Sequence, residues 1–79
     1  MADVKVDESI DLRGEVCPIP DVETKRALRR MTSGQILEVI IDYPMSKERI
    51  PEAVTRDGNE VLSTEEIASS EWKIRIKKG

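Results

Sequence analysis

Residues 35–42, QILEVIID, are the stretch of the chain that decides the fold. The stretch is short, rich in β-branched residues and almost continuously apolar, which is typical of a strand covered on at least one face of its sheet. Asp42-Tyr43-Pro44 interrupts this pattern. We therefore predict a central strand over 35–42, with other elements packed around it.

A helix is predicted before this strand. Pro18 and Pro20 suit the first turn of a helix, where a missing N–H costs little, and most residues from there to Met31 are good helix formers. Gly34 suits the exit from the helix. Helical spacing predicts one face turned to the core, made of Pro20, Thr24, Ala27, Leu28 and Met31.

A second helix is predicted after the strand, with Ser46 as its N-cap and Met45 and Ile50 as a hydrophobic staple. Met45 is accordingly expected in the core, like Met31. Pro51 removes one backbone hydrogen bond, so this helix is expected to kink or to begin later than Ser46. Its apolar face comprises Ile50, Ala53 and Val54, and Gly58 ends it.

Three more strands complete the pattern. Mostly even apolar spacing over residues 4–12 predicts an extended segment that ends in a strand at about Ser9–Leu12. Glu60–Ile67 and Glu71–Lys77 are the other two, and in the last of them Trp72, Ile74 and Ile76 alternate with basic residues. The expected fold is an α/β (α+β) two-layer sandwich, βαβαββ, with two helices on one face of a four-stranded mixed sheet, forming a single domain over 1–79.

Composition excludes several functions. The 79 residues carry a formal net charge of −3 and a pI near 5.0, which disfavours direct nucleic-acid binding. One cysteine and no histidine exclude an intramolecular disulfide, a Cys/His zinc site and a Cys-His catalytic pair. We expect no metal and no organic cofactor. Without a signal-peptide run or a membrane-spanning stretch, the chain is expected to be cytoplasmic and not embedded in a membrane.

The segment that carries chemistry is the loop Arg13–Val16 with the following Cys17-Pro18-Ile19-Pro20. Pro18 biases Cys17 away from helical dihedrals, as an N-cap requires, and the helix dipole there favours a thiolate. The two prolines leave only the N–H groups of Cys17 and Ile19 as donors, and acidic residues oppose ionisation: Glu15, Asp21 and Glu23. We expect moderate activation of the thiol. On these residues alone, a buried structural cysteine is about as well supported.

The chain resembles the TusA/SirA-like family of sulfur carriers over nearly its whole length. Asp11-Leu12-Arg13-Gly14 leads into the Cys-Pro-x-Pro element at residues 17–20, and a helix, Gly34, an apolar strand and Asp42 follow. The second helix carries Ile50-Pro51, as in the family.

The resemblance implies a fold like the C-terminal domain of translation initiation factor 3 and a sulfurtransferase that acts as a protein sulfur carrier. Cys17 would hold sulfur as a persulfide, received from a cysteine desulfurase, a rhodanese or thiosulfate and passed to an acceptor protein. The expected partners are therefore sulfur-donor and sulfur-acceptor proteins. The residues that would bind substrate or shape the site are Arg13, Gly14, Pro18, Ile19 and Pro20.

The family's tRNA-thiolation members place a Leu-Arg pair directly before the cysteine, where this chain has Glu15-Val16. The substitution is closer to members associated with a membrane transporter for thiosulfate or related sulfur compounds. Such a transporter is thus a further expected partner.

Other basic residues allow two interpretations each. Arg13 would stabilise a persulfide or a sulfur oxyanion, or it would anchor its loop by hydrogen bonds. A basic stripe on the first helix would dock an acidic partner, or it would be a solvated face with Asp21–Lys25 and Glu23–Arg26 pairs. The stripe comprises Lys25, Arg26, Arg29 and Arg30.

Two alternatives to sulfur transfer stay open at this point. One is a non-catalytic regulatory or interaction module in which Cys17 is structural. The other is a redox-sensing thiol, for which the chain offers no second cysteine to resolve a sulfenic acid.

Overall fold

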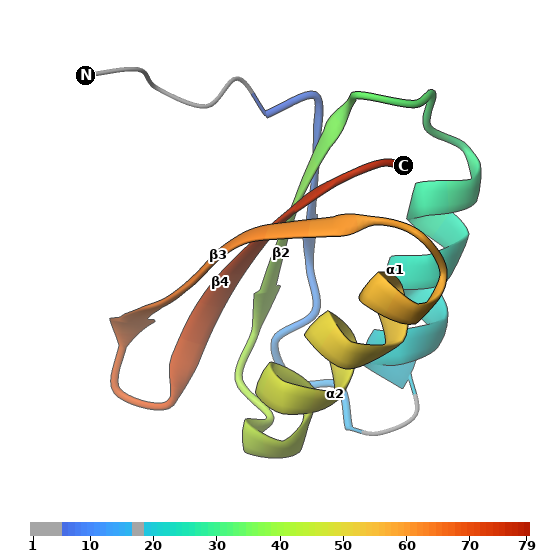
Figure 1. The fold of residues 1–79 in the computed structure, drawn as a ribbon. Coiled ribbons are helices and arrows are strands. Elements are labelled where there is room, and N and C mark those ends of the chain that lie inside the picture. The colour runs from blue at the N-terminus through green and yellow to red at the C-terminus, as the bar shows by residue number, and fades with distance from the viewer. Residues whose placement is uncertain (1–5, 17–18) are drawn as a thin grey trace.

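A computed structural model describes residues 6–16 and 19–79 of the chain. Figure 1 shows two helices packed against one face of a four-stranded sheet. The element order is βαβαββ: β1 (Glu8–Asp11), α1 (Ile19–Arg29), β2 (Ile36–Ile41), α2 (Pro44–Arg56), β3 (Glu60–Ala68) and β4 (Glu71–Lys77). The predicted two-layer α/β sandwich is confirmed.

The sheet is mixed, with strand order β1-β2-β4-β3. β1 runs parallel to β2, with Ile10 opposite Val39, and the connection between them crosses over through α1. β4 is antiparallel to both β2 and β3, and Ile74 lies opposite Val39 on one side and Thr64 on the other. The stretch that includes β2 is therefore central in the sheet, as predicted.

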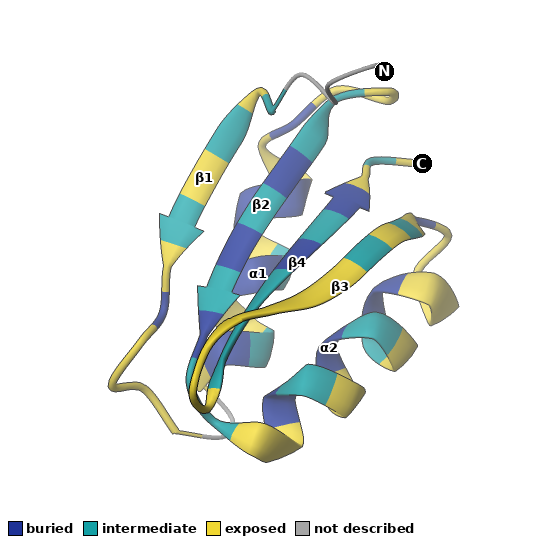
Figure 2. Ribbon diagram, turned by 90° about the vertical axis from the view of Figure 1, so that its left-hand side faces the viewer, coloured by how far each residue is buried: buried dark blue, intermediate teal, exposed yellow. Residues whose placement is uncertain are grey.

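The core lies between the helices and the sheet. β2 alternates strictly between buried and half-buried residues, and Figure 2 shows similar banding over the second half of β4. Burial of this apolar face is the main stabilising contribution in a domain of this size. The buried apolar residues are Leu12, Ala27, Leu28, Met31, Leu37, Val39, Ile41, Ile50, Val54, Ile74 and Ile76.

The helix faces follow the predicted periodicity. On α1, Pro20, Thr24, Ala27 and Leu28 are buried, and Met31 is buried just beyond its end. On α2, Ile50 and Val54 are buried and Ala53 is half-buried, and Gly58 follows the helix with a φ of 92°. Such a positive φ suits glycine because it has no Cβ.

The start of α2 was predicted wrongly. The helix begins at Pro44, its N-cap is Tyr43, and Ser46 lies inside the first turn, buried and without a capping hydrogen bond. Met45 is 53% exposed, so neither the hydrophobic staple nor its place in the core is correct. Pro44 presets the φ angle that a first helical residue needs, so the helix starts two residues before Ser46.

α2 continues through Pro51, and its buried residues keep their helical spacing on both sides of it. It lies within the helix that runs from Pro44 to Arg56, so the later start that Pro51 led us to expect is wrong. A proline inside a helix leaves the carbonyl four residues earlier without its usual partner. In α2 that carbonyl belongs to Lys47.

Neither α1 nor α2, the helices of residues 6–16 and 19–79, is long and apolar enough to cross a membrane.

Candidate functional site

Both helices start at the same end of the sheet, where β1 and β2 finish (Figure 1). β1 ends at Asp11, the loop Arg13–Val16 follows, and α1 begins at Ile19. Cys17 and Pro18, the predicted nucleophile and its helix-starting neighbour, lie outside the described residues. The described part of the site consists of the loop before Cys17 and the helix after Pro18.

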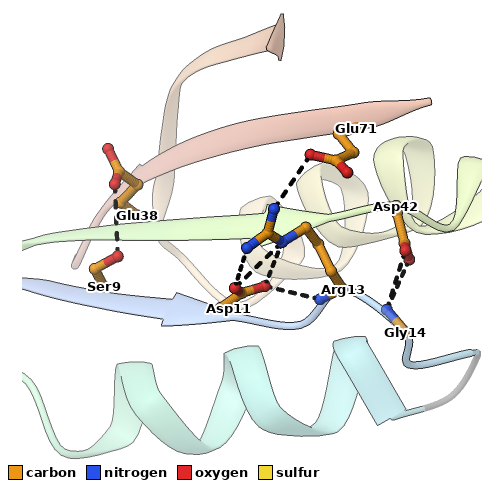
Figure 3. Close-up of polar contacts among 7 residues, drawn as sticks. All are labelled: Ser9, Asp11, Arg13, Gly14, Glu38, Asp42 and Glu71. Atoms are coloured by element: carbon orange, nitrogen blue, oxygen red, sulfur yellow. Dashed lines mark hydrogen bonds and ion pairs between the residues drawn. The ribbon is translucent and has the colours of Figure 1, made fainter. Parts of the chain in front are cut away.

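The loop is anchored to β2 through Gly14. Figure 3 shows the Gly14 N–H donating to both carboxylate oxygens of Asp42, at 3.0 and 3.1 Å. Gly14 has a φ of 88°, a conformation that L side chains rarely adopt. The Leu12 N–H donates to the Ile40 carbonyl at 2.7 Å, which continues the β1–β2 pairing into the loop. The backbone leading to Cys17 is therefore fixed relative to the central strand.

Arg13 ties the same loop to β1 and β4. Its Nε and Nη2 donate to the two Asp11 oxygens at 3.0 and 2.7 Å, and its Nη1 donates to Glu71 Oε1 at 3.4 Å (Figure 3). The Arg13 backbone N–H also donates to Asp11 Oδ1. These contacts agree with the interpretation in which Arg13 anchors its loop by hydrogen bonds. Its predicted contact with sulfur remains a prediction.

The Arg13–Asp11 pair changes the acidity of both groups. Hydrogen bonds from the Arg13 side chain and N–H hold the pKa of Asp11 at about 2, below its ordinary value of 3.8. The same contacts raise the pKa of Arg13 above its ordinary range. Arg13 therefore stays a cation, paired with a carboxylate, at any pH where a thiolate could form.

This pairing gives a testable pH dependence. Because the pKa of Asp11 is lower in the folded state, the Arg13–Asp11 pair stabilises the fold fully above pH 3.8. This stabilisation is lost as the pH falls through about 2. NMR titration of the Asp11 carboxyl should give a midpoint near 2, which Arg13→Ala should raise towards 3.8. Arg56→Ala, which breaks an exposed ion pair with Glu52 elsewhere, should leave the midpoint unchanged. An unaltered midpoint in Arg13→Ala would contradict the assignment.

The first two residues of α1, Ile19 and Pro20, offer no free backbone N–H. The Ile19 N–H, predicted to be available to the thiolate, instead donates to the Val16 carbonyl at 3.0 Å, and Pro20 has no N–H. The Pro20 side chain is buried in the core, whereas that of Ile19 is 42% exposed. Ile19 and Pro20 thus have different surroundings. Because the Ile19 N–H is bonded to Val16, we expect less activation of the thiol than the sequence alone indicated.

Acidic side chains at the site are partly paired. Asp21, in the first turn of α1, lies 3.8 Å from Arg49 of α2. The predicted Asp21–Lys25 pair is wrong, because Lys25 instead lies 3.8 Å from Asp57. Helical spacing predicts neighbours on one helix, but the packing of α1 against α2 brings other partners closer.

The rest of the basic stripe is divided among different contacts. Arg26 pairs with Glu23 at 3.6 Å, as predicted, and Arg30 pairs with Glu8 of β1 at 3.3 Å. Arg29 has no carboxylate within 4.0 Å in the described part of the chain. The stripe is therefore not one uniform solvated face.

Sequence reasoning gave no functional role to two residues of this site, Asp42 and Glu71. For Asp42 the sequence did carry a signal. Its carboxylate comes directly after a buried strand, at the same sheet edge as a loop that contains glycine. Glu71 gave no local signal, because its contact with Arg13 spans 58 residues. Within residues 6–16 and 19–79, no three Cys, Asp or Glu side chains form a group that could hold a metal ion.

Comparison with known proteins places this arrangement in a family. The family described as "Sulfurtransferase TusA" matches residues 8–78. A candidate sulfur carrier protein of Thermotoga maritima is 66% identical over 77 residues, covering 98% of each chain. One from Archaeoglobus fulgidus is 47% identical, covering 95% of this chain and 85% of its own.

Structural comparison agrees. The crystal structure of a SirA-like protein from Desulfitobacterium hafniense matches with a TM-score of 0.82 and 26% identity, covering 91% of this chain and 97% of the other. An Escherichia coli relative named as a candidate sulfur carrier, TsuB, is 32% identical over 90% of this chain and 95% of its own. From the family match and these relatives, we conclude that the chain belongs to the TusA family.

Proposed function

We propose that this protein is a sulfur carrier, which holds one sulfur atom as a persulfide on Cys17 and passes it from a donor to an acceptor protein. The family match over residues 8–78 carries this proposal, because it includes the only cysteine of the chain. Relatives named as candidate sulfur carriers cover nearly the whole chain and support the same role.

The transfer needs no oxidant, reductant or cofactor. The Cys17 thiolate attacks the terminal sulfur of a donor persulfide, a new S–S bond forms, and the donor leaves as a thiolate. With thiosulfate as donor, the same attack releases sulfite and the persulfide takes one proton. In the second step an acceptor thiolate attacks the terminal sulfur, and the Cys17 thiolate leaves.

The anchored loop supports such a role because a carrier must present its sulfur in one position to two successive partners. Gly14 is tied to Asp42, and Arg13 is tied to Asp11 and Glu71, so the backbone before Cys17 has little freedom. A positioned nucleophile reacts faster than a mobile one because less entropy is lost on the way to the transition state.

The surroundings of the loop also support partner-assisted chemistry. Ile19 and Pro20 supply no free N–H at the start of α1, and Glu15 and Asp21 flank the motif, so these groups stabilise a thiolate only weakly. A donor or acceptor that brings positive charge or N–H donors would supply the rest. Sulfur transfer is then favoured inside a complex with the correct partner.

An apolar surface is available for such partners. Val16, Ile19 and Val22 are 56%, 42% and 47% exposed around the start of α1. Met45 belongs to the same end of the fold: it lies one helical turn before Arg49, which reaches Asp21 of α1. Burying these side chains against a partner is favourable, and the small area suits an interface that must also dissociate.

The test is mass spectrometry of the reduced protein after incubation with thiosulfate, or with a cysteine desulfurase and cysteine. We expect one added sulfur, removed by dithiothreitol and located on the peptide that contains Cys17. A second incubation with an acceptor protein of the family's relay should remove the sulfur. A chain that stays unmodified with the desulfurase, a rhodanese persulfide and thiosulfate would contradict the proposal.

Gly14→Ala should slow sulfur loading while costing about 1–2 kcal/mol of folding free energy, because a Cβ strains a residue at φ 88°. No atom lies within 4 Å of the added Cβ, so the cost is backbone strain alone. Gly34→Ala is the matched control: its φ is 94°, it also has open space, and it lies before β2 at the other end of the sheet.

We expect similar unfolding free energies for the two glycine variants in urea titrations, but slower loading kinetics only for Gly14→Ala. Equal loading rates would show that the Gly14 loop does not position the thiol.

A membrane transporter of thiosulfate, expected as a partner from Glu15-Val16, stays a prediction. So does the absence of a metal or organic cofactor.

A further inference from the structure

A pocket lies at the end of the fold opposite the Gly14 loop. It has a volume of about 350 Å³ and is lined by Lys25, Leu28, Arg29, Asp57, Asn59 and Lys78. These residues come from the second half of α1, from the turn after α2 and from the end of the chain beyond β4. Figure 1 shows these segments gathered at the end of the molecule where both helices finish.

The charge of this pocket is opposite to that of the protein. Three cations and one carboxylate line it, whereas the whole chain has a formal net charge of −3. Asp57 lies 3.8 Å from Lys25, too far for a hydrogen bond. Neither Arg29 nor Lys78 has a carboxylate within 4.0 Å among the residues that the structure describes.

The other lining groups do not compensate this charge. Leu28 is apolar and buried. The Asn59 side chain is neutral and partly engaged, because its Nδ2 donates to the Val54 carbonyl at 3.2 Å and its Oδ1 accepts from the Gly79 N–H at 2.9 Å. The pocket therefore has a neutral interior, and two of its three cations, Arg29 and Lys78, have no carboxylate partner among the described residues.

The backbone at the pocket is also fixed. The Lys78 N–H donates to the Gln35 carbonyl, and the Lys78 carbonyl accepts from the Gly34 N–H, both at 2.8 Å. Arg29 is the last residue of α1. A ligand would meet cations on a framework that is already in place, which reduces the ordering cost of binding.

We propose that this pocket binds a small anion carrying a phosphate or sulfate group, held by Arg29, Lys78 and Lys25. The planar guanidinium of Arg29 can donate two parallel hydrogen bonds to such a group, and the two lysines add point charges. The volume lies at the lower end of the range for small-molecule sites, so the class includes free oxyanions and small phosphomonoesters. The site is separate from the Gly14 loop and does not depend on persulfide chemistry.

The test is a set of two-dimensional ¹H–¹⁵N NMR titrations of the full chain with inorganic phosphate, inorganic sulfate and glycerol 3-phosphate, all at constant ionic strength. Saturable shifts at the amides of Leu28, Arg29, Asn59 and Lys78 are expected. Tighter binding of glycerol 3-phosphate would assign the site to phosphomonoesters, and equal binding would assign it to free oxyanions.

Arg29→Ala and Lys78→Ala should each weaken binding about tenfold or more, because each removes a charge-assisted contact. Arg26→Ala is the matched control, since it removes a positive charge from the same helix outside the pocket and should change the affinity less than twofold.

Two results would overturn the proposal: shifts that sodium chloride reproduces at the same ionic strength, or equal losses in Arg26→Ala and Arg29→Ala. Because these titrations use the thiol form of the protein, their failure would leave the sulfur-loading experiment unaffected.

Discussion

A chain carrying Cys17→Ser should accept no sulfur from a desulfurase, a rhodanese or thiosulfate, while it stays folded. Serine differs from cysteine by one atom, but its hydroxyl does not ionise near neutral pH and cannot form the S–S bond of a persulfide. Since Cys17 is the only cysteine, no other thiol of the chain can replace it. The measurement is the intact mass after incubation with each donor, with circular dichroism to confirm folding.

A relocated thiol gives the sharper control for this variant. Ser69 is exposed in the turn between β3 and β4, so Ser69→Cys added to Cys17→Ser restores one accessible thiol at another place. We expect the relocated thiol to load and deliver sulfur at least about tenfold more slowly, because reactivity depends on the surroundings of the thiol. Equal rates at the two positions would show that any exposed thiol suffices, and the proposed role of the anchored loop would then be wrong.

The periodicity of the sequence predicted all six elements of this fold, and it was clearest in α1, α2, β2 and β4, which each bury one face. The nearly continuous apolar run of β2 and the alternation of Ile74 and Ile76 with basic residues both appear in the structure as predicted. Positions 20, 24, 27, 28 and 31 likewise form the buried face of the first helix. Local patterns suffice where burial alone decides the conformation.

Prediction failed where two local signals compete. Ser46 is a good N-cap residue, but Pro44 presets a helical φ two residues earlier, and the helix begins there. Met45 consequently lies outside the core and joins the exposed apolar residues around the start of α1. The N-cap lies three residues earlier than predicted, at Tyr43 in place of Ser46, and this error moves Met45 from the interior to the surface proposed for partners.

Contacts between distant segments could not be predicted from local patterns. Arg13 contacts Glu71, Asp21 contacts Arg49, and Lys25 contacts Asp57 only because of how the helices and strands are oriented in the folded chain. The motif around Cys17 was visible in the sequence, whereas the bonds that hold its loop were not. The same limit applies to the anion pocket, whose three cations come from both α1 and the end of the chain.

Ile74→Ala should cause one of the largest losses of stability among single substitutions in this protein. Ile74 is fully buried on β4, between Val39 of β2 and Thr64 of β3, so alanine would leave a cavity at the centre of the sheet. Such truncations cost about 2–5 kcal/mol. A domain of this size has a free energy of unfolding of roughly 4–12 kcal/mol, so the variant would lose a large fraction of it.

Ile67→Ala is the matched control for this measurement. Ile67 is the same residue type, on the neighbouring strand β3, but it is 41% exposed. Its truncation should change the free energy of unfolding by no more than about 0.5 kcal/mol. Urea titrations of both variants would decide, and equal losses would mean that the core does not centre on β2 and β4. Because the Gly14 loop is anchored to β2 and, through Arg13, to β4, Ile74→Ala should also slow sulfur loading, whereas Ile67→Ala should not.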